Sequence, residues 1–74
     1  MNLNDFNARA RYVYTKLLPL VQAATDDRVE GLSYESCGDD EEVVAHFADG
    51  SQCRVTVTGR NYFDMAVDVL KAVA

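Results

Sequence analysis

Two runs of apolar residues on either side of Asp49-Gly50 constrain the fold more than any other feature. Residues 43–48 and 52–58 keep an apolar side chain at every second position, which is the pattern of a half-buried strand. A two-residue Asp-Gly loop would turn the two apolar sets to opposite faces of the hairpin, whereas a three-residue loop, residues 48–50, places both on one face. The three-residue loop predicts the pairs Phe47 with Ser51, Ala45 with Cys53, and Val43 with Val55.

A helix is predicted on each side of the strands. Residues 4–24 carry apolar side chains at spacings of three and four, with Asn2 or Asn4 as the N-cap. Pro19 lacks an N–H and crowds the preceding turn, so we expect a kink near Leu18 or a second helix that begins at Pro19. The stripe consists of Leu3, Phe6, Ala10, Val13, Leu17, Leu20 or Val21, and Ala24.

The second helix is predicted over residues 61–73, capped by Asn61. Its only charged side chains are Asp64, Asp68 and Lys71, which leaves an apolar arc wider than a one-sided helix needs. We therefore expect it to contact more than one element, a second subunit among them, with fraying of the chain end as the alternative.

A further strand is predicted over residues 29–36, in which Gly31 marks a bulge that turns Val29 back to the core. Residues 37–40 form the turn into the next strand. The sequence predicts one α+β domain, residues 1–74, with the order α-β-β-β-α and both helices packed on one face of a three-stranded antiparallel sheet. The predicted strands are about 29–36, 42–48 and 51–58.

This order of elements is similar to that of the double-stranded-RNA-binding domain, over the whole chain. The resemblance is one of topology and length. Those domains are expected to begin their second helix with a lysine-rich segment, whereas residues 59–65 here offer Arg60 and Asp64.

The charge distribution excludes several classes of protein. The net charge is −5, and residues 25–50 hold nine acidic residues against Arg28 alone, which disfavours nucleic acid and anionic membranes as partners. The chain shows neither a secretory leader pattern nor an apolar run of about 20 residues, so we expect a cytoplasmic protein. Cys37 and Cys53 are expected to be free thiols, and with one histidine they give no zinc spacing.

His46 is the one imidazole, and parity places it on the open face of the sheet, away from the helices. A solvated strand histidine is the simpler interpretation, because no oriented nucleophile or set of ligands accompanies it. The acidic run at residues 39–42 is interpreted as a solvated turn, with a calcium site as the alternative. The predicted open sheet face consists of Ser33, Val44, His46, Gln52 and Arg54.

Arg9 and Lys16 lie on one face of the first helix, and we expect them to pair with the acidic middle of this chain or of a neighbouring one. Four tyrosines are many for this length, and tyrosine is common at interfaces. The candidate protein interface consists of Tyr12, Tyr14, Met65, Val69 and Ala72.

The leading hypothesis is a small non-enzymatic protein-interaction domain that forms a homodimer. It rests on the small core, the wide apolar arc and the lack of a nucleophile, base and electrostatic stabiliser in one place. The alternative is an acidic decoy, whose carboxylates in residues 26–49 take the place of phosphates on a nucleic-acid-binding protein. A module similar to the double-stranded-RNA-binding domain comes third, because the charge disfavours it. No cofactor, metal, nucleic acid or membrane partner is expected.

Overall fold

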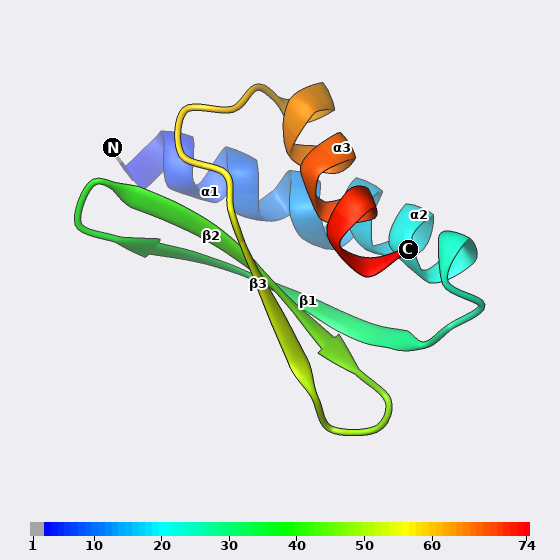
Figure 1. The fold of residues 1–74 in the computed structure, drawn as a ribbon. Coiled ribbons are helices and arrows are strands. Elements are labelled where there is room, and N and C mark those ends of the chain that lie inside the picture. Colours follow the sequence, from blue (N-terminus) through cyan, green and yellow to red (C-terminus); the bar gives the residue numbers. More distant parts are fainter. Residues whose placement is uncertain (1–2) are drawn as a thin grey trace.

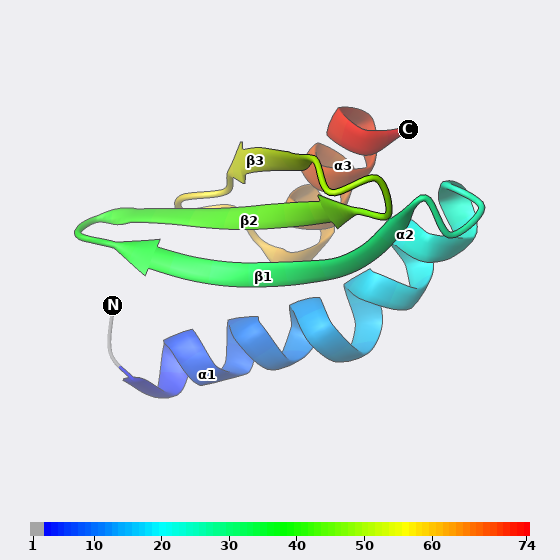
Figure 2. The same cartoon turned by 90° about the horizontal axis from the view of Figure 1, so that it is seen from below.

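The computed structural model describes residues 3–74, with side chains from Asn4 onward, so the expected cap at Asn2 and the side chain of Leu3 lie outside the described residues. The elements are α1 (Leu3–Tyr12), a π-helical turn η1 (Val13–Leu17), α2 (Leu18–Ala24), β1 (Val29–Cys37), β2 (Asp40–Phe47), β3 (Gln52–Thr56) and α3 (Tyr62–Val73). The fold is α+β in the order α-β-β-β-α, as predicted, with strand order β1-β2-β3 (Figure 1). Figure 2 shows α1 running alongside β1, with α3 behind the strands.

The first helix passes Pro19 without a break. The turn before it widens to the π form, in which the N–H of Leu18 donates to the carbonyl of Val13, five residues back. A wider turn relieves the crowding that the proline ring imposes on the preceding residues. The irregularity therefore lies in the turn directly before the expected kink, and Pro19 follows it in the first turn of α2.

The β2–β3 hairpin has the predicted three-residue loop. Ala45 pairs with Cys53 and Val43 with Val55, and the N–H of Phe47 donates to the carbonyl of Ser51 over 2.9 Å. Gly50 adopts φ +92°, in the region where a side chain would be strained. The register therefore collects the large apolar residues of both strands under the helices.

β1 contains the predicted bulge, because its pairing with β2 shifts register between Val29 and Gly31. Val29 is fully buried as a result. β3 ends at Thr56, two residues earlier than expected. The N–H of Val57 still donates to the carbonyl of Glu41, but the N–H of Glu41 donates to the Thr58 hydroxyl instead of returning a bond to Val57.

One core lies between the sheet and the helices. Its largest fully buried side chains come from η1, α2, β1, β2, the segment after β3, and α3. They are Leu17, Met65, Val13, Val21, Val29, Val43, Val57 and Val69, with Val44 fully buried on the other face of the sheet.

Candidate protein-interaction surfaces

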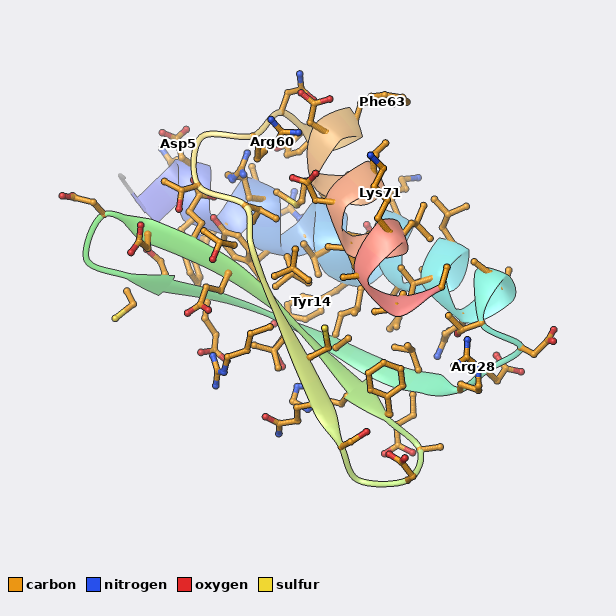
Figure 3. All side chains as sticks on the ribbon, viewed as in Figure 1. Asp5, Tyr14, Arg28, Arg60, Phe63 and Lys71 are labelled. Atoms are coloured by element: carbon orange, nitrogen blue, oxygen red, sulfur yellow. The ribbon has the colours of Figure 1, made fainter. Side chains whose placement is uncertain are left out.

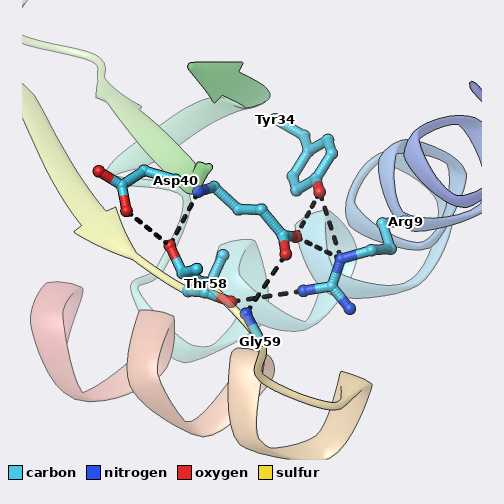
Figure 4. A network of polar contacts seen from close by, with 7 residues as sticks. Arg9, Tyr34, Asp40, Thr58 and Gly59 are labelled. Atoms are coloured by element: carbon cyan, nitrogen blue, oxygen red, sulfur yellow. Dashed lines mark hydrogen bonds and ion pairs between the residues drawn. The ribbon is translucent and has the colours of Figure 1, made fainter. Parts of the chain in front are cut away.

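A polar network fastens α1 to the sheet at one end of the core (Figure 4). The Nε–H of Arg9 donates to the Glu41 carboxylate over 2.5 Å and to the Tyr34 hydroxyl over 3.2 Å. The Tyr34 hydroxyl in turn donates to the same carboxylate. The side chains of Arg9 and Glu41 are only 15% and 9% exposed, so their ion pair is largely shielded from solvent.

The same network holds the connection from β3 to α3. Glu41 accepts from the N–H of Gly59 over 3.3 Å, and its own N–H donates to the Thr58 hydroxyl over 2.9 Å. The guanidinium of Arg9 also donates to the Val57 carbonyl over 3.4 Å. Because this connection leads directly into α3, Glu41 helps to set where that helix begins.

The ionisation of the network follows from these contacts. Burial by itself would raise the pKa of Glu41, but hydrogen bonds from Tyr34, Gly59 and Arg9 outweigh it and hold the pKa below its ordinary value. Burial and the hydrogen bond to Glu41 raise the pKa of Tyr34 to about 12. In the favoured state Arg9 and Glu41 are both charged, and Tyr34 is neutral and donates its hydroxyl hydrogen to the Glu41 carboxylate.

Tyr62, the first residue of α3, packs onto α1. Its ring stacks on that of Tyr12 with centroids 4.5 Å apart and planes 13° from parallel, and the guanidinium of Arg9 lies 5.9 Å from its centroid. A shallow groove of about 250 Å³ runs over this stack. Its lining consists of Ala8, Arg11, Tyr12, Thr15, Lys16 and Tyr62.

The outer face of α3, defined here as Phe63, Asp64, Val67, Leu70 and Lys71, is the second candidate surface. Phe63 is 75% exposed, the largest value among the exposed large hydrophobic residues. Figure 3 shows Phe63 and Lys71 on the part of α3 turned away from the strands. Val67 and Leu70 are half-buried and follow at helical spacing on the same side.

The structure corrects two of the expected interface residues. Met65 and Val69 are fully buried in this chain's own core, so neither is available to a partner in the folded protein. An aspartate at either position would place an unpaired charge in the core rather than test an interface. Ala72 is exposed, on the opposite edge of α3 from Phe63.

Tyr12 is half-buried in the ring stack, while Tyr14 is 47% exposed. The hydroxyl of Tyr14 accepts the N–H of Tyr34 over 3.3 Å. That N–H belongs to β1, an edge strand of the sheet. Tyr14 therefore satisfies one N–H of this edge strand.

The five residues expected on the open sheet face do share that face. Ser33 and Arg54 flank Val44 in register, and Gln52 pairs with His46. Three of them have polar partners: the Ser33 hydroxyl lies 2.8 Å from Nε2 of His46, and Arg54 forms ion pairs with Glu35 at 3.3 Å and Glu42 at 3.8 Å. Val44 is fully buried among them, so this face offers little apolar surface for docking.

A hollow of about 260 Å³ lies at the end of the β2–β3 hairpin, between Arg28 and the residues 47–49. Arg28 and Asp49, which carry opposite charges, both line it. The Ser51 hydroxyl and N–H donate to that carboxylate and lower its pKa. The hollow therefore has no excess of either charge.

Sequence reasoning missed the role of Glu41. Its place in the acidic run with Asp39, Asp40 and Glu42 predicts a solvated turn, yet Glu41 is buried. Strand parity carried the signal, because Glu41 shares its parity with Val43. Within the described residues, no three His, Cys, Asp or Glu side chains group as a metal site would require.

No protein-family model matches the chain, and no curated protein or solved structure is similar enough to count as a relative. Among residues 3–74, no helix has the length and apolar character needed to cross a bilayer.

Proposed function

We propose that this protein is a self-associating interaction domain whose two copies pair through the outer face of α3. The observation that carries the proposal is the exposure of Phe63, which is 75% accessible at the first turn of a helix whose opposite side is the core. Such a position in a monomer exposes a large aromatic ring to water without an evident structural benefit, and aromatic residues are enriched in the centres of interfaces.

The charges beside Phe63 favour a second copy as the occupant. Asp64 and Lys71 are seven residues apart, hence on one side of α3 and separated by about 10 Å along its axis. Within the described chain neither forms an ion pair, whereas Asp68 is paired with Arg60 at 2.9 Å. In two antiparallel copies of α3, Asp64 of one copy lies against Lys71 of the other, twice by symmetry.

A single helix face is smaller than the roughly 800 Å² per partner of a standard interface. The dimer is therefore expected to dissociate on dilution. We also propose that the protein resides in the reducing cytoplasm. Its two free thiols, Cys37 and Cys53, support this location.

The acidic-decoy alternative gains nothing from the contacts described. Glu41 is committed to Arg9 and Tyr34, and Glu35 and Glu42 to Arg54. Part of the negative charge of the acidic middle segment is therefore already paired within the chain.

Molar mass in solution, measured by light scattering over a range of concentrations, tests the proposal. Phe63→Ser is expected to abolish the dimer while leaving the circular dichroism spectrum unchanged. Leu20→Ser is the matched control, because Leu20 is an exposed apolar residue of α2, 50% accessible and outside the proposed interface. A parent protein that stays monomeric at every concentration, or an equal loss in both variants, would refute the proposed pairing.

A further inference from the structure

We propose that the groove over the Tyr12–Tyr62 stack, on a different surface from the outer face of α3, is a docking site for an acidic peptide segment of a partner protein. The two stacked rings and Ala8 give the groove an apolar part. Aromatic rings accept apolar side chains and peptide planes at little entropic cost when, as here, the rings are already held in place.

The walls of the groove are basic. Arg11 and Lys16 both line it, and both side chains are exposed. In the described part of the chain neither has an ion-pair partner, whereas the salt bridges engage Arg9, Arg54 and Arg60. Two unpaired cations in a groove lined by stacked rings, on a chain of net charge −5, make the groove electrostatically distinct from its surroundings.

Arg9 supports the ring stack. The guanidinium of Arg9 lies 5.9 Å from the centroid of Tyr62 and is itself fixed by Glu41. The Thr15 hydroxyl donates to the Arg11 carbonyl over 2.7 Å, across the junction of α1 and η1. The groove is therefore preorganised for a ligand rather than formed by it.

Carboxylates fit this site better than a nucleic acid does. A nucleic acid presents a continuous line of phosphates and needs many cationic contacts, but only Arg11 and Lys16 line the groove. Beyond it, a long polyanion would meet the acidic residues of this chain. A short peptide with carboxylates spaced around an apolar side chain needs only the groove.

The direct test is fluorescence anisotropy of a fluorescein-labelled peptide of repeating Glu-Glu-Phe triplets, titrated with the full chain at low salt. We expect saturable binding that is lost at about 1 M salt, where the screening length falls to about 3 Å. The nitrogen–proton NMR spectrum should shift mainly at residues 8–16 and 62. A peptide of repeating Lys-Lys-Phe triplets should not bind.

Arg11→Glu and Lys16→Glu are each expected to weaken the acidic peptide about tenfold. Arg28→Glu is the matched control, because it makes the same change in net charge. Arg28 is exposed, has no ion-pair partner among the described residues and lies at the far end of the molecule (Figure 3). This control should bind like the parent. Phe63→Ser should also bind normally, which separates this inference from the proposed dimer. Equal weakening by Arg28→Glu, or tighter binding of an RNA duplex than of the peptide under the same conditions, would overturn the inference.

Discussion

Arg9 of α1 and Glu41 of β2 are 32 positions apart in the chain, yet Nε of the first lies 2.5 Å from Oε2 of the second. With Tyr34 they form a polar contact that joins the first helix, two strands and the entry to α3. The proposed groove depends on it, since Arg9 also supports the ring of Tyr62.

Glu41→Gln is predicted to be far more destabilising than the same change at the next residue. Glutamine leaves Arg9 without its shielded counter-charge, which should cost about 3 kcal/mol of the free energy of unfolding. Glu42→Gln breaks only a 3.8 Å contact to the half-exposed Arg54, which is worth less than about 1 kcal/mol. Urea unfolding of the two variants measures the difference, and equal midpoints would contradict the assigned role of Glu41.

Stability is predicted to fall in acid through Glu41. Because its pKa is lowered in the folded state, the unfolded chain binds the proton more readily. The contribution is therefore complete above the ordinary glutamate value of about 4.3 and is lost as the pH falls through the folded value. Unfolding free energies from about pH 6 to pH 3 should decline more steeply for the parent than for Glu41→Gln, both in trimethylamine oxide to keep the variant folded. Parallel profiles would exclude this linkage.

The free energy of unfolding is also predicted to fall at alkaline pH, because of Tyr34. Its pKa rises to about 12 on folding, so the folded state resists forming the tyrosinate. The contribution is complete below the ordinary tyrosine value of about 10 and is lost as the pH rises from there towards the folded value. Tyr34→Phe should lack this decline between about pH 10 and pH 12. The measurement is urea unfolding across that interval, and an identical decline in both proteins would show that other groups cause it.

Two glycines are predicted to respond differently to substitution by alanine. Gly50 has φ +92° and Gly31 has no positive φ, while a methyl group at either would meet nothing within 4 Å. Gly50→Ala should therefore cost about 1 kcal/mol from backbone strain alone. Gly31→Ala should be neutral or stabilise by up to about 1 kcal/mol, because it restricts the unfolded chain. Thermal unfolding of both variants decides this, and destabilisation by Gly31→Ala would show that the bulge needs glycine.

Local patterns are sufficient to predict the α+β architecture, and parity alone selects the register in which Val43 pairs with Val55. Parity also points to Glu41, but composition outweighs it in the prediction, because an acidic run usually lies in solvent. Burial of that carboxylate depends on Arg9, a long-range partner that no local pattern identifies. The π turn before Pro19 is not predicted for a related reason. The sequence shows where the proline interrupts regular helical hydrogen bonding, but tertiary packing determines whether the helix kinks, breaks or widens there.

The side of α3 that faces the core was also within reach of the sequence. Asp64, Asp68 and Lys71 form one strip, and the core lies opposite to it. Val69 falls on that opposite side, so the charged strip identifies it as a core residue. Met65 lies only about 60° from Asp68 around the helix axis, so the strip does not identify it. Periodicity does not reveal whether Phe63, on the outer face of α3, packs against a second protein chain, since that depends on a surface outside this helix.

The proposed antiparallel pairing of α3 predicts that two charge variants associate only with each other. The Asp64→Lys variant has lysine at both positions 64 and 71, and the Lys71→Asp variant has aspartate at both. Each variant alone would therefore bring like charges together in the dimer and should be monomeric. In a mixture, the introduced lysine of the first variant meets the introduced aspartate of the second, while the retained Lys71 of the first meets the retained Asp64 of the second. Two opposite-charge contacts are thereby restored. Light scattering of the separate and mixed samples, with circular dichroism to confirm folding, measures this. A mixture that stays monomeric while the parent forms dimers would rule out the antiparallel arrangement and leave Phe63 with a different partner.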